Sequence, residues 1–259
     1  QISFQLFIFA MAVLVVMQWI RNDRERAQLE SSLRFKNRVL SVIAHDLKNP
    51  IASVAQFAEL LDSKPQLSSK SHVRNSLRES SQAALTLLDN LLYWGRSESE
   101  RLSITPEMID MKDVVKDVVS LYQHMALQKE LDFTSEVKTG ASAYADPVLI
   151  KTVLRNLVSN AIKFTPKGGK VHIRVWREQE RTCCSVADTG VGLSAEYLER
   201  FETEGYLDST AGTDQEIGTG LGLQLIKDMV EKNNGTLNIE SKSNVGSTFT
   251  FTLPVTKKE

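Results

Sequence analysis

A histidine with an acid beside it stands inside a helical apolar repeat, in "SVIAHDLKNPIASV" (41–54). His45 lies about 200° around a helix from the apolar Leu47, so its ring is expected to face water. Pro50 removes a backbone donor and crowds the carbonyl of Asp46, which predicts a distortion one turn after the histidine. An exposed imidazole at a distorted turn suits a reactive nucleophile, but an exposed histidine on a helix often has no function, and this stretch alone does not decide between the two.

A second set of polar side chains lies on the helix expected at 147–164. Asn156, Asn160 and Lys163 stand at i, i+4 and i+7, on one face beside an apolar stripe. Amide oxygens suit Mg²⁺, and an ammonium group suits phosphate oxygens. This face therefore predicts a metal–phosphate site.

Two glycine clusters flank a polar segment, 204–217, that is typical of a mobile lid. Asp188 ends an expected strand, where its carboxylate could accept a hydrogen bond from an adenine amino group. Gly190 and Gly192 permit tight turns and close backbone approach. The second cluster opens a helix and would expose backbone N–H groups to an anion, through Gly218, Gly220 and Gly222.

The spacing Gly190-x-Gly192-x-x-Ala195 also fits a dinucleotide-binding fingerprint. That fingerprint needs a second strand ending in an acid about 20 residues further on. The chain has the polar segment there instead, so a dinucleotide site is not expected.

The first residues, 2–20, carry no charge, and as a helix they would reach roughly 28 Å, close to the hydrocarbon thickness of a bilayer. A basic segment follows at 21–38. We therefore predict a transmembrane helix at 1–20 and a juxtamembrane linker helix at 21–38, with the downstream side in the cytoplasm. The alternatives are a signal peptide, which wants its basic residues before the apolar run, and a buried helix.

Residues 39–97 show two amphipathic helical patterns joined by a polar loop at 62–70, which predicts an antiparallel hairpin. One hairpin cannot bury both apolar stripes, whereas two hairpins can do so as a four-helix bundle. We therefore expect a homodimer. The composition turns polar near 95–107, where a domain boundary is expected.

Residues 104–256 mix the two kinds of element, which predicts a second domain with a sheet covered by helices on one face. Asp146 and Pro147 have the types of an N-cap and a first helical residue. The expected helices lie at about 108–130, 147–164 and 219–233. The expected strands are 170–177, 182–188, 235–241 and 247–254.

The composition argues against a nucleic-acid partner, a disulfide and a zinc site. Lys plus Arg (31) nearly equals Asp plus Glu (32), so charge gives no reason to expect nucleic acid. Cys183 and Cys184 are adjacent on an expected strand and point to opposite faces, which suits neither a disulfide nor a zinc site.

Taken together, the motifs resemble those of sensor histidine kinases of two-component signalling. "SVIAHDLKNPIASV" resembles the H-box, "LRNLVSNAIKFTP" the N-box, "DTGVGL" the G1 box and "GTGLGL" the G2 box. The resemblance covers roughly 36–255. It implies a dimerisation and phosphotransfer hairpin followed by a Bergerat-type (GHKL) ATP-binding domain, an α/β sandwich with a mixed sheet.

The resemblance also implies roles for single residues. His45 would be the phosphoacceptor, Asp46 would orient its ring, and Asp46 with Asn49 matches the family's phosphatase motif. Asn160 would be the Mg²⁺ ligand. The ATP-binding residues would be Asn156, Asn160, Lys163, Asp188, Gly190, Gly192, Phe201, Gly218, Thr219, Gly220, Leu221 and Gly222. In one departure, Leu198 and Phe201 stand where the family often has two phenylalanines before the lid.

These features predict an ATP- and Mg²⁺-dependent kinase at the inner membrane of a bacterium, with its catalytic part in the cytoplasm. Its partners would be a second copy of the chain and the receiver domain of a response regulator. One rival is a gyrase-type ATPase of the same fold, which needs a glutamate base where this chain has Asn156. A second rival is a membrane-tethered scaffold without kinase activity.

Overall fold

The computed structural model describes residues 104–204 and 222–257 without a break, apart from the side chains of 202–204. It also describes residues 47–48 and 50–59 and scattered positions between 11 and 26 and between 77 and 95. Several predicted site residues lie outside this part of the chain, and their roles stay predictions: His45, Asp46, Asn49, Gly218, Thr219, Gly220 and Leu221.

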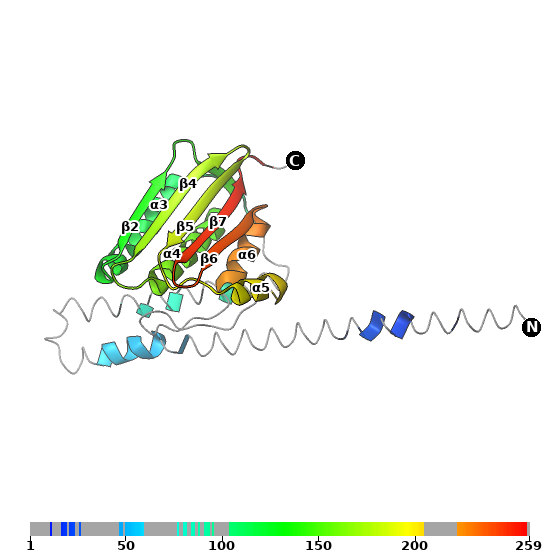
Figure 1. Ribbon diagram of the computed structural model, residues 1–259, viewed down its shortest axis with the longest axis horizontal. Helices are drawn as coiled ribbons and strands as arrows, with labels where there is room; N and C mark the ends of the chain where they lie inside the picture. The colour runs from blue at the N-terminus through cyan, green and yellow to red at the C-terminus, as the bar shows by residue number, and fades with distance from the viewer. Residues whose placement is uncertain are drawn as a thin grey trace, which may run out of the picture.

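The second domain is built on a mixed sheet whose strands lie in the order β2-β4-β5-β7-β6 (Figure 1). β2 and β4 run parallel, and the other neighbours run antiparallel. These strands are β2 (Asp132–Val137), β4 (Lys170–Glu178), β5 (Arg181–Asp188), β6 (Thr236–Lys242) and β7 (Gly246–Pro254). A separate antiparallel pair is formed by β1 (Glu107–Asp110) and β3 (Ser142–Ala145).

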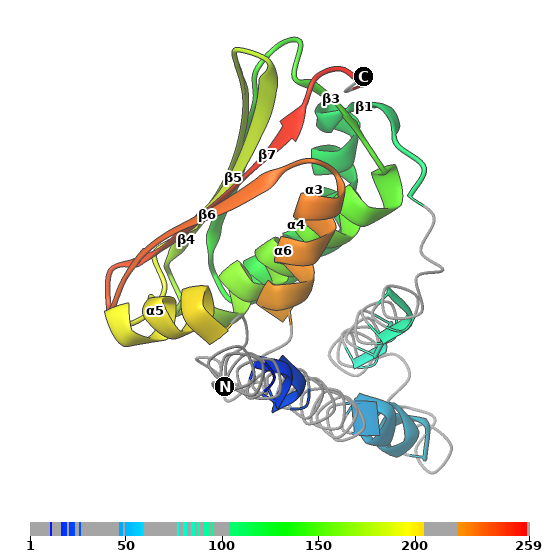
Figure 2. The same cartoon turned by 90° about the vertical axis from the view of Figure 1, so that its right-hand side faces the viewer.

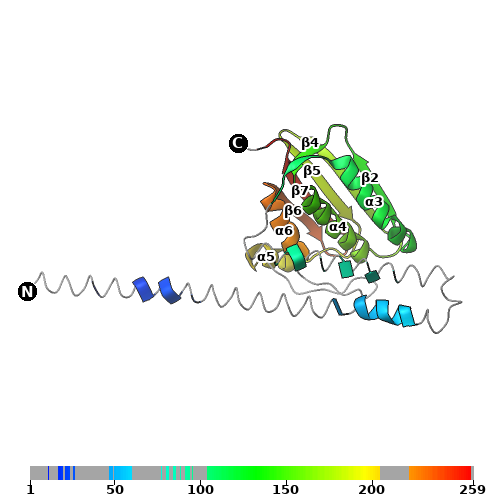
Figure 3. The same ribbon diagram turned by 180° about the vertical axis from the view of Figure 1, so that it is seen from behind.

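Three helices cover one face of this sheet (Figure 2). They are α3 (Met111–Gln128), α4 (Pro147–Phe164) and α6 (Gly222–Lys232), and α4 lies between the other two (Figure 3). A fourth helix, α5 (Ala195–Glu204), follows the loop after β5. The predicted α/β layers, with a mixed sheet and helices on one face, are confirmed.

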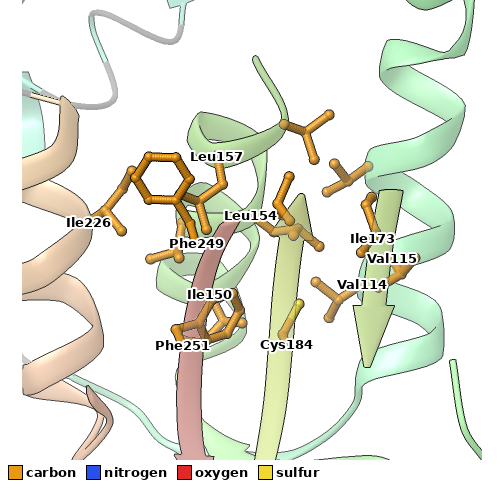
Figure 4. Packing of buried hydrophobic residues seen from close by; sticks show 14 of the residues in the cluster. Val114, Val115, Ile150, Leu154, Leu157, Ile173, Cys184, Ile226, Phe249 and Phe251 are labelled. Atoms are coloured by element: carbon orange, nitrogen blue, oxygen red, sulfur yellow. The ribbon is translucent and has the colours of Figure 1, made fainter. Parts of the chain in front are cut away.

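The core lies between the sheet and the three helices (Figure 4). Alternate residues of β4 and β7 point into it, so that His172 and Thr250 lie on the opposite face while Ile173 and Phe251 are fully buried. Cys184 points into the core, and Cys183 is buried on the other face. Both cysteines are free, as their adjacency predicted.

Helix α4 begins and ends where the sequence predicted. The Asp146 carboxylate accepts hydrogen bonds from the backbone N–H groups of Val148 (2.9 Å) and Leu149 (3.1 Å), and Pro147 occupies the first turn. A short acceptor at the N-cap satisfies donors that the helix itself cannot satisfy, so this boundary is readable from local sequence.

The predicted start of the first helix of this domain was wrong. The apolar residues Met108 and Ile109 belong to β1, and the helix begins at Met111. Asp110 is its N-cap and accepts a hydrogen bond from the Lys112 N–H at 2.8 Å. The apolar pattern extends across the boundary between β1 and α3 because Ile109 of β1 is also buried, so the sequence pattern did not mark where the helix begins.

Residues 50–59 are helical, as expected for the hairpin. Near the end of the expected second hairpin helix, Tyr93 is buried, and its hydroxyl donates to Asp228 Oδ2 on α6 at 2.6 Å. Lys232 Nζ lies 3.2 Å from the same Asp228 oxygen and 5.4 Å from the centroid of the Tyr93 ring. These contacts place Tyr93 against the helix that follows the second glycine cluster.

Within the described residues, no helix has the length and apolar character needed to cross a membrane. Of the predicted span, 1–20, only Met11, Met17, Gln18 and Trp19 belong to that part of the chain. The transmembrane helix therefore stays a prediction.

Replacing Ile150 with alanine should destabilise the ATP-binding domain by about 2–5 kcal/mol, because its side chain is fully buried under the sheet. Val148→Ala on the same helix is the matched control, since Val148 is 71% exposed and its loss should change stability by no more than about 0.5 kcal/mol. Amide hydrogen exchange of β4 to β7 in the full chain measures both. Equal effects of the two variants would contradict this description of the core.

Candidate functional site

A cavity of about 230 Å³ lies where α4 and β5 end. It is smaller than the roughly 300–1,000 Å³ typical of pockets for drug-sized ligands, which suits a single flat ring system rather than a large ligand. Its walls come from α4, the loop after β5, α5 and β7, through Asn160, Phe164, Asp188, Val191, Gly192, Leu193, Ser194, Tyr197, Ser247 and Phe249.

Asp188 supplies the carboxylate of this cavity. Its Oδ1 accepts hydrogen bonds from the backbone N–H groups of Gly190 (2.8 Å) and Ser247 (3.3 Å). Burial raises the pKa of this carboxyl, and the two backbone hydrogen bonds oppose that rise. The cavity therefore contains a carboxylate acceptor that two backbone N–H groups hold in place. Their hydrogen bonds offset only part of the free energy that the carboxylate loses when it is removed from water.

The glycines after Asp188 let the loop pass close to its neighbours. A Cβ at Gly190 would overlap the carbonyl oxygen of Phe164, the last residue of α4. Gly192 has a φ of +65°, and a Cβ there would overlap the carbonyl of Lys242. Between them, the Val191 N–H donates to the Phe164 carbonyl at 3.1 Å, which joins this loop to the end of α4.

The predicted polar face of α4 is only partly directed to the cavity. Asn160 lines it, and Lys163 Nζ lies 5.1 Å from the ring centroid of Phe164, a wall residue. Asn156 is 8% exposed, and its amide donates to the Thr152 carbonyl at 2.9 Å, so it does not line the cavity. The structure thus brings together Asn160, Asp188 and Gly192 of the predicted site.

Two further predicted residues lie elsewhere. Phe201 is buried on α5, with Lys227 Nζ of α6 at 5.8 Å from its ring centroid, and it does not line the cavity. Gly222 is the first residue of α6 and also lies outside the cavity wall. Phe201 belongs to α5, which precedes the segment 205–221, and Gly222 belongs to α6, which follows it.

Sequence reasoning missed several wall residues. Ser247 faces Asp188 directly in the β5–β7 register, a pairing that no local pattern reveals. Tyr197 comes from α5, which the sequence analysis did not predict as a helix. Val191 and Leu193 stood inside the first glycine motif, whose apolar positions could have been taken as wall residues.

Comparison with known families assigns both parts of the chain. Residues 145–257 match the family of histidine kinase-, DNA gyrase B- and HSP90-like ATPases, and residues 35–100 match the His Kinase A (phospho-acceptor) domain. The chain belongs to the sensor histidine kinases. It carries a phospho-acceptor domain and an ATPase domain, and the range matched to the ATPase domain includes every residue that lines the cavity described above.

Curated relatives agree with this family. The chain is 30% identical over 243 residues to the adaptive-response sensory kinase SasA of Thermosynechococcus vestitus, and the match covers 90% of this chain and 63% of the relative. It is also 30% identical over 241 residues to the non-motile and phage-resistance protein of Caulobacter vibrioides, covering 90% and 29%. The chain thus spans less than two thirds of the length of these relatives.

Solved structures support the fold of this kinase. The Acinetobacter baumannii histidine kinase AdeS matches with a TM-score of 0.58 and 21% identity, over 82% of this chain and 98% of that chain. The histidine kinase ThkA, in its complex with the response regulator protein TrrA, matches with a TM-score of 0.56 and 22% identity, over 84% and 61%.

Replacing Asp188 with asparagine should leave the kinase at least as stable at pH 7 as the unaltered chain. Asparagine keeps an oxygen that can accept from Gly190 and Ser247 but removes a buried charge. Because burial raises the pKa of Asp188, the folded state binds its proton more tightly than the unfolded state, so the ionised carboxylate opposes folding at neutral pH.

Any stability advantage of Asp188→Asn should therefore shrink as the pH falls through the raised pKa of the folded state, and it should be smallest below the ordinary carboxyl pKa, where Asp188 is protonated in both states. Urea unfolding of both proteins at several pH values measures this difference. A large loss of stability in the variant at pH 7 would show that the ionised carboxylate is a net stabilising group.

Proposed function

We propose that the protein is a sensor histidine kinase that uses ATP to phosphorylate His45 and then passes the phosphoryl group to an aspartate of a response regulator. The observation that carries this proposal is the backbone-held carboxylate of Asp188 inside a small cavity beside Asn160. The match of residues 35–100 to the phospho-acceptor family supports the first part of the reaction.

The cavity suits the adenine ring of ATP. Both backbone hydrogen bonds to Asp188 end on Oδ1, so Oδ2 is the oxygen that would accept from the adenine amino group. Phe164, Val191 and Phe249 offer apolar surface to the faces of the ring. An ionised acceptor held by the backbone needs no rearrangement to bind such a donor, which favours adenine over a base with a carbonyl at that position.

The phosphates would extend from the cavity toward Asn160 and Lys163, at the last turns of α4. The described residues contain no group of three His, Cys, Asp or Glu side chains that could hold a metal by themselves. A single amide oxygen from Asn160, with phosphate oxygens and waters, fits the coordination that Mg²⁺ prefers. Mg²⁺ bound there would neutralise phosphate charge during transfer.

His45 would act through the lone pair of one ring nitrogen, which attacks the γ-phosphorus while the bond to the β-phosphate oxygen breaks and ADP leaves. Asp46 would accept a hydrogen bond from the other ring N–H and stabilise the positive charge that develops on the imidazole. The same Asp46 with Asn49 matches a phosphatase motif, so we also propose a capacity to dephosphorylate the regulator.

A gyrase-type hydrolase is the rival within this fold. Asn156, at the position where such enzymes hold a catalytic base, cannot accept a proton from water, and its amide is bonded within the helix. This observation favours transfer to histidine over rapid hydrolysis.

The central experiment incubates the chain with Mg²⁺ and γ-labelled ATP beside His45→Ala and Asp188→Asn. The proposal expects label on the unaltered chain that is lost in acid and survives base, and none on His45→Ala. Asp188→Asn should bind ATP at least about tenfold more weakly, because it presents a donor to the adenine amino group. Label that survives on His45→Ala would contradict the assigned phosphoacceptor, and ATP binding without any label would favour the scaffold.

We further propose that the kinase is a homodimer held by its hairpins. In the single chain, apolar residues of the expected hairpin stay exposed: Ile51 (53%), Leu85 (53%), Leu88 (40%) and Leu92 (47%). A second hairpin would cover such a surface in a four-helix bundle.

Replacing Leu88 with glutamate should therefore convert the dimer to monomers, because a charge would enter the bundle. Leu127→Glu is the matched control, since Leu127 is 61% exposed on α3 of the other domain. Sedimentation of the full chains measures both. A wild-type chain that sediments as a monomer, or a Leu127→Glu chain that dissociates equally, would contradict the proposed interface.

Membrane attachment through 1–20 and a place at the bacterial inner membrane belong to the same proposal, supported by the apolar run and its basic flank in the sequence.

A further inference from the structure

The last turn of α4 has a complete set of donors for carbonyls that the helix cannot satisfy. The Ala161 carbonyl accepts from the backbone N–H of Thr165 (3.1 Å) and from its hydroxyl (2.6 Å). The Phe164 carbonyl accepts from the Val191 N–H at 3.1 Å. The carbonyls between them, of Ile162 and Lys163, need donors from another part of the chain.

Lys129 supplies those donors. Its Nζ donates to the Ile162 carbonyl at 3.0 Å and to the Lys163 carbonyl at 2.9 Å, across 33 and 34 residues of sequence. One ammonium group can make both bonds because it carries three N–H donors. Its positive charge also stands at the negative end of the α4 dipole, where a cation is favourable.

The position of Lys129 is itself defined. It is the C-cap of α3, where its backbone N–H donates to the Leu127 and Met125 carbonyls. The next residue, Glu130, has a φ of +54°, which turns the chain into β2. The side chain is half-buried between the two helix ends. Lys129 therefore joins the end of α3 to the end of α4 from a fixed backbone.

We propose that Lys129 is a positioning residue of the kinase: it holds the last turn of α4 so that Asn160 and Lys163 face the nucleotide. The inference rests on the proposed function of that turn. Lys129 does not line the cavity and bonds the backbone of Lys163 rather than a ligand. Since the same turn carries the Phe164 carbonyl that holds the loop after Asp188, Lys129 acts on both walls of the cavity through α4.

A neighbouring ion pair provides a matched control. Lys167 Nζ and Glu130 Oε1 are 2.8 Å apart and join the loop after α4 to the loop after α3, but their side chains are 69% and 64% exposed. An ion pair so exposed contributes little to stability or to local order. Loss of the Lys167 charge should therefore have no comparable effect.

The test compares Lys129→Met, Lys129→Arg and Lys167→Met in the full chain with Mg²⁺ present. Methionine keeps an unbranched side chain but removes both hydrogen bonds to α4. We expect the Kd for ADP and the KM for ATP to rise about tenfold, because the nucleotide would then have to order the last turn of α4 when it binds. The rate at saturating ATP should stay within about twofold. Arginine should restore both constants to within about threefold, and Lys167→Met should match the unaltered chain.

Amide hydrogen exchange separates positioning from general stability. In Lys129→Met, exchange should accelerate in the last turn of α4 and in the loop after β5, while β4 to β7 keep their protection. Unchanged nucleotide affinity, equal effects of Lys167→Met, or a loss of protection throughout the sheet would each overturn the inference. If the unaltered chain fails to bind nucleotide, the proposed function fails first; if it binds normally and Lys129→Met does too, only the role of Lys129 fails.

Discussion

The loop after β5 passes so close to the last residue of α4 that no side chain fits between them. A Cβ at Gly190 would overlap the Phe164 carbonyl, and the adjacent Val191 N–H donates to that same carbonyl. Much of the cavity depends on this approach, because it sets α4 and its Asn160 beside the carboxylate of Asp188. Lys129 completes the junction from the other side, through the two preceding carbonyls. The geometry of the binding face therefore depends on the last turn of α4 and on the contacts that hold it.

The buried carboxylate of Asp188 lowers the stability of the folded domain at neutral pH. Asp188 is held as an acceptor by two backbone donors, yet burial still raises its pKa, so its ionised form opposes folding at neutral pH. A side chain chosen for stability alone would be neutral. A buried acceptor with a partly compensated charge is instead what a ligand donor can use, and this favours a binding role for Asp188 over a structural one.

The parts of the fold that depend on local rules were predictable from sequence. Helix α4 was predicted with its observed bounds because Asp146 and Pro147 mark its start, and strands β4 to β7 were predicted near their bounds from their alternation. The strands β1, β2 and β3 were missed. β1 and β3 have only four residues each, and in β2 only Phe133 is buried, so none of the three shows a clear alternation of apolar and polar residues. The roles of Ser247 and Lys129 depend on strand register and on a contact between helix ends, which no local pattern contains.

The most direct test of this account is the titration of the Asp188 carboxyl by NMR in the full chain, with and without ADP. The account predicts a pKa above the ordinary value near 3.8 in the free protein, because burial dominates. It predicts a lower pKa with ADP bound, because the adenine amino group would donate to the ionised form and favour it. A pKa at or below the ordinary value, or one that ADP leaves unchanged, would contradict the claim that this backbone-held carboxylate binds the nucleotide.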